Sequence, residues 1–180
     1  MPELTPTDVE NYTQGRLNRA DPETTRVLAA ALRGARRRCG WHVTPVRTND
    51  VVTIDGPGSR LLALPTLRLD VLTEVIEDGS AVPVTDLYVS PRGMVEKKSG
   101  LWWTGNLGGI TVKMTHGFDA AEDFDAAVLS LIDRLATAAA GGRARVIGPF
   151  QYDIDAVTSG SAFTDIENGF LEQYELEDPA

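Results

Sequence analysis

The sequence has one cysteine, two histidines and no long apolar run. A single cysteine cannot form an internal disulfide, which fits a reducing compartment. No stretch approaches the ~18 apolar residues that a membrane helix needs, and the chain does not begin with a basic segment followed by an apolar one. We therefore expect a soluble, unsecreted protein.

Basic residues are missing from the end of the chain. Residues 151–180 contain eight acids and no lysine or arginine, so this segment carries −8 of the formal net charge of −9. The other residues are close to neutral. Because duplex affinity comes largely from neutralising phosphates, a chain without a broad basic surface is a poor candidate for a DNA-binding protein.

Motifs of catalysis and metal binding are also missing. The sequence has no G-x-S-x-G elbow, and its glycine-rich stretches match neither the Walker nor the dinucleotide pattern. Cys39, His42 and His116 could be metal ligands, but a structural zinc site needs four ligands. We expect no catalytic residue, no metal and no cofactor, and an unrecognised hydrolase site is the weakest alternative.

Helical patterns occur on both sides of a different middle region. Capping residues, among them Thr5 with Asp8 in the first turn, and apolar spacing predict helices at about residues 5–17, 21–39 and 120–139, the first two forming an αα-hairpin. Thr164 and Glu167 are placed as a capping box nearer the end of the chain. We expect the last helix to pack on the second through Phe124, Val128, Leu131, Ile132 and Leu135 against Val27, Leu28 and Leu32. At 180 residues the chain can bury one real core.

The middle region, about residues 41–117, has a period of two and frequent turn signals. In the run "GITVKMTHGF", Ile110, Val112 and Met114 share one face, as in a half-buried antiparallel strand. Gly117 then provides the backbone freedom to leave the strand. The sequence therefore predicts an α+β fold: a helical bundle core with an inserted antiparallel β-rich region and an extended acidic C-terminal tail.

The tail, residues 149–180, is expected to follow a folded body at residues 1–148. Its apolar residues alternate in a strand pattern and then take helical spacing, and we predict that they bind another chain: Phe150, Tyr152, Ile154, Phe163, Ile166, Phe170, Leu171 and Tyr174. Truncation after Gly148 should then leave the body folded. The alternative is a tail that folds onto its own subunit.

Two further groups are candidates for contacts. Arg36, Arg37 and Arg38 end a helix, where the dipole favours cations, and could also contact DNA phosphate weakly. Trp102 and Trp103 are adjacent, so on a strand they point to opposite faces and at most one enters the core. The other is a candidate partner anchor, in loops between about Asp78 and Gly109.

The order of these elements resembles the head-tail connector, or adaptor, proteins of long-tailed double-stranded DNA phages. The resemblance covers about residues 5–140 and rests on an αα-hairpin that ends in "RRRCGWHV", then "LPTLRLDVLTEVIEDG", "GITVKMTHGF" and "AAVLSLIDRLA". "LPTLRL" lacks the proline that the family often has where Arg68 or Leu69 stands. The acidic tail is not covered by these motifs.

This resemblance implies a non-enzymatic virion protein of the head-tail neck, assembled in the host cytoplasm. It implies a homo-oligomeric ring, usually twelvefold, with portal protein above, a stopper or tail component below and DNA passing through the lumen. The alternative is a small acidic-tailed protein-binding module that acts as a DNA mimic or chaperone-like segment. No membrane partner is expected.

Overall fold

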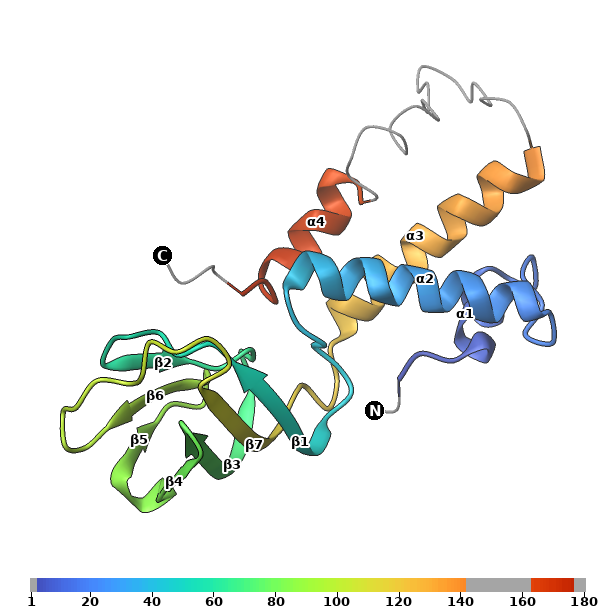
Figure 1. Ribbon diagram of the computed structural model, residues 1–180. Helices are drawn as coiled ribbons and strands as arrows, with labels where there is room; N and C mark the ends of the chain where they lie inside the picture. Colours follow the sequence, from blue (N-terminus) through green and yellow to red (C-terminus); the bar gives the residue numbers. More distant parts are fainter. Residues whose placement is uncertain (1–2, 142–162, 177–180) are drawn as a thin grey trace. The chain divides into compact units, whose positions relative to one another are not determined.

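The computed structural model describes residues 3–141 and 163–176 (Figure 1). The chain divides into two compact units, a helical unit of residues 2–39 and 121–175 and a β unit of residues 40–120. The β unit is thus inserted in sequence between two parts of the helical unit. The predicted mixed α+β composition is confirmed.

The helical unit contains four described helices, α1 (Pro6–Tyr12), α2 (Pro22–Cys39), α3 (Glu122–Gly141) and α4 (Asp165–Glu172). Local signals explain their starts. Thr5 and Asp8 form a capping box on α1, with the Thr5 N–H donating to Asp8 Oδ2 at 2.8 Å. Thr164 and Glu167 form the same box on α4. Both caps were predicted from the sequence.

The first helix is shorter than predicted. It ends at Tyr12, and the predicted extension to residue 17 is wrong because Gln14 and Gly15 adopt positive φ angles of 52° and 79°. The turn that follows is held by Thr13, whose hydroxyl donates to the Val9 carbonyl at 2.8 Å. A left-handed residue cannot continue an α-helix, so the chain turns here towards α2.

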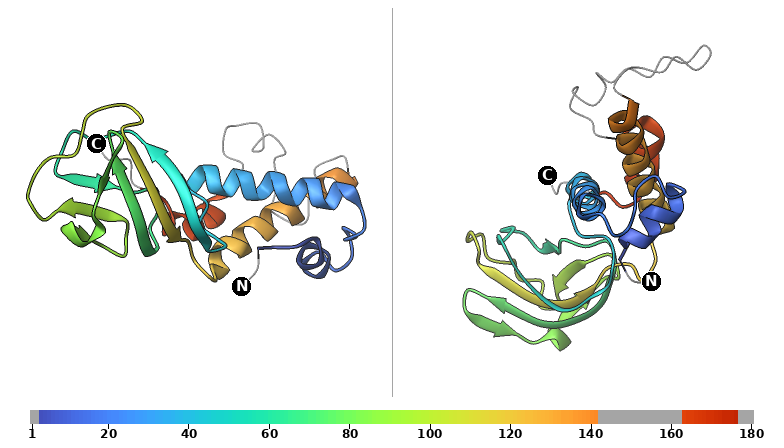
Figure 2. Two further views of the ribbon diagram at one scale, coloured as in Figure 1. Left: turned by 60° about the horizontal axis from the view of Figure 1, so that its bottom comes forward. Right: turned by 90° about the vertical axis from the view of Figure 1, so that its right-hand side faces the viewer.

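Apolar side chains from α2, α3 and α4 form the core of the helical unit, and these helices pack on one another (Figure 2). Most of the predicted contact residues are buried, but Val27 and Leu135 are only half-buried because they lie at the margins of their stripes. The side chains of this helical core that are fully or nearly fully buried include Leu28, Ala31, Leu32, Phe124, Val128, Leu131, Ile132 and Leu171.

The β unit contains two antiparallel sheets, visible in both views of Figure 2. The first has the order β1-β7-β3-β4 and the second β2-β6-β5. A short 3-10 helix, η1 (Val84–Asp86), precedes β5. The strands are β1 (Arg47–Ile54), β2 (Leu61–Ala63), β3 (Leu69–Glu77), β4 (Ser80–Val82), β5 (Leu87–Val89), β6 (Met94–Lys97) and β7 (Ile110–His116).

The inner faces of the two sheets share one hydrophobic core. In β7, Ile110, Val112 and Met114 are fully buried while Thr111 and Lys113 are half-buried, as the alternation predicted. Leu62 and Val95 from the second sheet lie in the same cluster. The core therefore holds both sheets together, and their outer faces are left to solvent or partners.

Gly117, directly after β7, occupies a position where only glycine fits. Its φ is +109°, and a Cβ here would lie 2.5 Å from His42 Nε2 and 2.9 Å from the Pro45 carbonyl oxygen. His42 Nε2 itself lies 3.0 Å from that oxygen. The predicted role of Gly117 as the exit from the strand is confirmed.

None of the described helices is both long and apolar enough to cross a bilayer.

Candidate partner-binding surfaces

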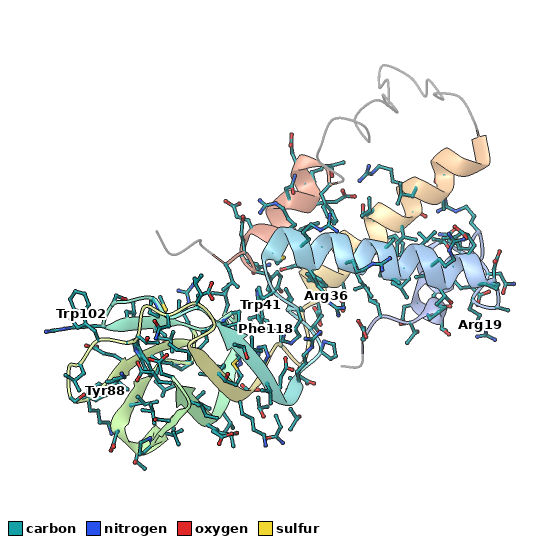
Figure 3. The ribbon with its side chains drawn as sticks, in the orientation of Figure 1. Arg19, Arg36, Trp41, Tyr88, Trp102 and Phe118 are labelled. Atoms are coloured by element: carbon teal, nitrogen blue, oxygen red, sulfur yellow. The ribbon has the colours of Figure 1, made fainter. Side chains whose placement is uncertain are left out.

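The connection between β6 and β7, residues 98–109, displays the exposed tryptophan predicted from the sequence. Trp103 is 2% exposed and lies in the β core, whereas Trp102 is 65% exposed. Figure 3 shows Trp102 at the periphery of the β unit. The proposed partner anchor is therefore Trp102 alone; Trp103 was also predicted to bind a partner, and its burial in the core makes it unavailable for this.

Backbone hydrogen bonds fix this connection, here called the Trp102 loop. The Trp103 N–H donates to the Ser59 carbonyl at 2.8 Å, and the Gly58 N–H donates to the Thr104 carbonyl at 2.9 Å. A Cβ on Gly56 would lie 2.1 Å from the Thr104 carbonyl oxygen, so the close approach needs glycine. The loop is thus ordered although it contains no helix or strand.

A largely buried ion pair adds a second restraint. Lys97 Nζ lies 2.6 Å from Glu77 Oε2, and the two side chains are 12% and 16% exposed. The same ammonium donates to the Trp102 carbonyl at 3.1 Å and lies 4.5 Å from the centroid of the Trp103 ring. Glu77 Oε1 accepts the Thr104 N–H at 2.7 Å. One charged pair therefore binds both halves of the loop.

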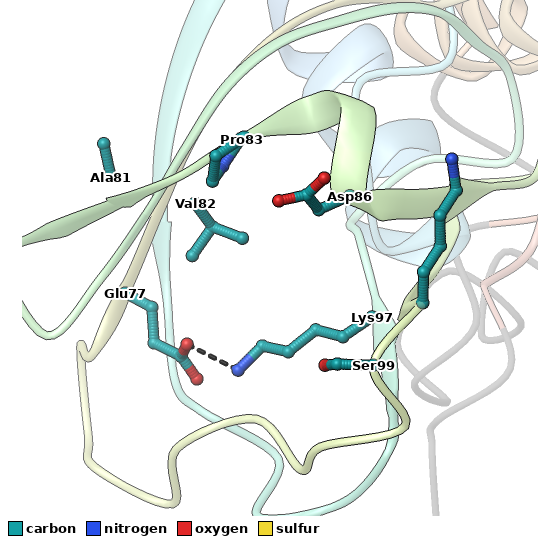
Figure 4. A pocket seen from close by; sticks show the side chains of 8 residues that line it. Glu77, Ala81, Val82, Pro83, Asp86, Lys97 and Ser99 are labelled. Atoms are coloured by element: carbon teal, nitrogen blue, oxygen red, sulfur yellow. Dashed lines mark hydrogen bonds and ion pairs between the residues drawn. The ribbon is translucent and has the colours of Figure 1, made fainter.

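A shallow cavity borders this ion pair. Figure 4 shows the Lys97 to Glu77 contact across it, with Asp86 and Pro83 on the opposite wall. Its volume is about 480 Å³, and its wall combines charged and apolar groups. Lys97 and Glu77 are engaged in the loop restraint, and Lys98 Nζ at the same wall donates to the Thr85 carbonyl at 2.7 Å, so we assign no substrate to this cavity.

Most of the large exposed apolar side chains described in the β unit lie on the Trp102 loop and the second sheet, whereas Val51 and Val71 lie on the first sheet. Leu101 and Leu107 of the loop are 65% and 87% exposed. On the outer face of the second sheet, Leu61 and Tyr88 are exposed on either side of Glu96, their common cross-strand neighbour. Because the loop is preorganised, a partner that covers Trp102 would pay little entropy to order it.

The arginine cluster at the end of α2 is largely engaged within the helical unit. Arg36 Nη2 lies 2.6 Å from Glu3 Oε1, and Arg38 forms an ion pair with Glu175. Glu175 is the main reason that the pKa of Arg38 is raised. Arg37 is exposed. The predicted weak DNA contact is thus left mainly to Arg37, since the other two bind acids that are distant in sequence.

The structure divides the tail's apolar stripe between core and surface. Phe163, Leu171 and Tyr174 are buried in the helical unit of the same chain, which is the alternative that the sequence left open. Ile166 is 74% exposed and Phe170 is also exposed. The other three predicted tail residues, Phe150, Tyr152 and Ile154, lie outside the described residues.

Glu167 has a second role besides the helix cap that the sequence predicts. It is 3% exposed and accepts hydrogen bonds from Ser130 Oγ and Arg134 Nη2 of α3, each at 2.8 Å. It also accepts the Thr164 N–H at 2.7 Å. The sequence could not show that this glutamate is buried, because the segment around it is rich in acids. Its single carboxylate both caps α4 and attaches it to α3.

The titratable groups of the β unit form no recognisable catalytic set among the described residues. His116 Nε2 lies 3.2 Å from Asp50 Oδ2, and its ring packs edge-on against His42 with 4.4 Å between centroids. Burial lowers the pKa of His116, against the opposing effect of Asp50. No group of three metal-ligating side chains occurs within the described ranges. These rings pack the strand exit.

Comparisons with known proteins give a structural likeness only. No family model matches the sequence, and no curated protein matches it. One similar solved chain is from the neck of an empty GTA particle computed with C6 symmetry, with a TM-score of 0.61, 16% identity and coverage of 98% of this chain and 91% of that one. Another is from the neck of a native GTA particle computed with C12 symmetry, with a TM-score of 0.57, 12% identity and coverage of 100% and 95%. The chain therefore shares the fold of these neck chains.

Proposed function

We propose that the chain is a structural, non-enzymatic subunit of the neck of a phage-like particle. In this role it forms a ring beneath the portal, joins the head to a stopper or tail component and surrounds part of the DNA channel. The observation that carries the proposal is the shared fold with two GTA neck chains, which extends over 98% and 100% of this chain. The sequence resemblance to connector proteins points to the same role independently.

The symmetry of those particles supports an oligomeric ring. The two necks were computed with C6 and C12 symmetry, and we adopt twelve copies for the ring of this chain. A ring needs a heterologous contact, in which two different surfaces of each subunit meet and the rotation closes. The proposed sites of action are the virion neck and, during assembly, the host cytoplasm.

The charge distribution suits a conduit that does not retain DNA. Residues 1–150 carry about −1 once the −8 of the last thirty residues is removed from the total of −9. A strongly basic channel wall would hold a duplex through counterion release, whereas a near-neutral wall lets it slide. Arg36 and Arg38, two of the most clustered cations, already pair with Glu3 and Glu175.

The Trp102 loop is the proposed contact with a neighbouring subunit or the next ring of the neck. A rigid loop with an exposed tryptophan and two exposed leucines has the composition of an interface anchor. The remaining tail residues, including exposed Ile166 and Phe170, are a second proposed contact. The partners we assign to these surfaces are an adjacent subunit of the ring, the portal and the stopper.

The alternative of an acidic DNA mimic has less support. A mimic displays carboxylates as an array facing solvent, but Glu167 and Glu175 of the tail bind Arg134 and Arg38 of the same chain. These two acids stabilise the helical unit. Competition with DNA for a basic protein would favour the mimic.

Electron microscopy of the chain mixed with its cognate portal tests the proposal. We expect a closed ring of this protein on one face of the portal, and we expect Trp102→Ala to impair assembly while leaving the chain folded. Tyr12→Ala, an exposed aromatic of α1, is the matched control. A chain that stays monomeric alone and never binds portal would refute the neck assignment.

A further inference from the structure

The exposed face of α2 is basic and carries small side chains. Arg26, Ala29, Ala30, Arg33 and Arg37 are all exposed, on the side of the helix away from the buried stripe. Arg26 pairs with Glu23 one turn earlier, at 2.7 Å, but both side chains are more than half exposed, so this contact is weak and exchangeable. The alanines leave room for another helix to approach closely.

The exposed face of α4 has the opposite character. Ile166 and Phe170 are exposed beside Asp165 and Glu172, which are exposed as well. The helix cannot simply rotate to bury the two apolar side chains, because Glu167, on its inner face, is held by Ser130 and Arg134 of α3. Within the described part of the chain, this apolar and acidic strip is therefore fixed in an exposed position.

The charged residues of the two faces have the same spacing. Arg26 and Arg33 are seven residues apart on α2, and Asp165 and Glu172 are seven residues apart on α4. Seven residues are about 10.5 Å along a helix and close to two turns, so each pair lies nearly in line. Along the helix axis, the alanines of α2 lie between its two arginines, and Ile166 and Phe170 lie between the two acids. At 3.6 residues per turn, Ile166 and Phe170 lie roughly 100–140° round α4 from Asp165, so they form the neighbouring side of the same exposed surface.

We propose that α4 of one copy packs against α2 of the next copy, with Ile166 and Phe170 against the alanines and with Asp165 and Glu172 at the edge of the contact, within reach of the long Arg26 and Arg33 side chains. The inference rests on the proposed function, since it names the contact between ring subunits. Because the two faces are different surfaces of one chain, the contact is heterologous and repeats from copy to copy. Duplex DNA would satisfy the arginines but leave the apolar strip of α4 exposed.

Thiol cross-linking of two variants tests the contact directly. Ala29→Cys places a thiol on the α2 face, and Gly169→Cys places one on α4, where an added Cβ meets no atom within 4 Å. The native Cys39 should not interfere, because it is buried and burial raises the pKa of its thiol to about 12.

With a short bismaleimide, a mixture of the two single-cysteine proteins should give a cross-linked dimer, whereas each variant alone should give little. A chain with both cysteines should give a ladder of higher oligomers. Homodimers from either single variant would indicate a symmetric contact and overturn the proposal. So would the absence of cross-linked product from the mixture in concentrated solution.

Reversing the charges on the two faces tests whether the partner of α2 is a second copy of the chain or DNA. Reversing Arg26 and Arg33 to Glu should reduce the cross-linked dimer about tenfold, because like charges then face each other along the contact. Asp165→Arg with Glu172→Arg should do the same, and mixing the two reversed proteins, each with its cysteine, should restore the product. Arg60→Glu with Arg92→Glu, exposed arginines of the β unit, is the matched control.

Two outcomes separate this inference from the proposed function. Failure of cross-linking together with a ring on portal in micrographs would reject the α2 and α4 contact but keep the neck assignment. If the variant with both arginines reversed bound duplex DNA more weakly than the unchanged protein but cross-linked equally well, the α2 face would be assigned to DNA phosphate and the contact would also be rejected.

Discussion

Replacing Trp103 by alanine should unfold the β unit at a much lower urea concentration. Burying roughly 200 Å² of an indole side chain at about 25 cal/mol per Å² stabilises folding by about 5 kcal/mol. The ring is 2% exposed, and its Nε1–H has no acceptor among the described residues. An unsatisfied buried donor costs about 1–3 kcal/mol, so the net loss on truncation should be about 3 kcal/mol.

Urea unfolding followed by circular dichroism measures this loss, with Trp102→Ala as the matched neighbour. Trp102 is 65% exposed, so its truncation should change the free energy of unfolding by no more than about 0.5 kcal/mol. Trp103→Phe keeps an aromatic ring and removes the unpaired N–H, so it should cost less than Trp103→Ala. A loss below about 1 kcal/mol for Trp103→Ala, or equal losses at the two positions, would refute this account of the loop.

Three other perturbations have defined outcomes. Leu131→Ala should lower the free energy of unfolding of the helical unit by about 2–5 kcal/mol, because Leu131 is 4% exposed; a smaller loss in the same urea assay would contradict the register of α3. Glu77→Gln should cost about 2–3 kcal/mol by leaving the Lys97 ammonium without its counter-charge, and in a double-mutant cycle its loss should shrink when Lys97→Met is also present. Burial, and to a lesser degree the nearby Asp8 carboxylate, raises the pKa of Asp125 to about 6, so the folded state holds this proton more tightly than the unfolded state and loses stability as the pH rises through that value. Asp125→Asn should therefore raise the melting temperature at pH 7.5, with a gain of about 1 kcal/mol in the free energy of unfolding after allowing for partial exposure, and this gain should vanish near pH 4. A gain that does not depend on pH would exclude this cause.

Local patterns allowed the sequence to predict much of the fold. A cap needs only residues three positions apart, so Thr5 with Asp8 and Thr164 with Glu167 could be identified without a structure. The alternation in β7 likewise lies within one segment. The early end of α1 was missed because the positive φ at Gln14 is unusual for a residue other than glycine.

The restraints of the candidate surfaces are non-local and could not be read from the sequence. Lys97 and Glu77 are separated by twenty residues, and Arg36 and Glu3 by thirty-three. Alternation predicted that at most one of Trp102 and Trp103 enters the core, but only the folded structure shows that it is Trp103. Periodicity could not assign sides to the tail either, because its stripe covers more of the α4 surface than one core contact uses.

The wide stripe of α4 changes how its role must be tested. Truncation after Gly148 was expected to leave a folded body, but the structure predicts the opposite, because it would remove buried Leu171 and Tyr174 from the helical core. Point substitutions separate the two roles. Ile166→Ser with Phe170→Ser should lower the free energy of unfolding by less than Leu171→Ala does, since these side chains are 74% and 38% exposed, and should abolish cross-linking between copies. Leu171→Ala should instead cost about 2–5 kcal/mol of stability, because the side chain is fully buried. If the exposed pair proves as important for folding as Leu171, α4 belongs wholly to the core and its outer strip has no separate partner.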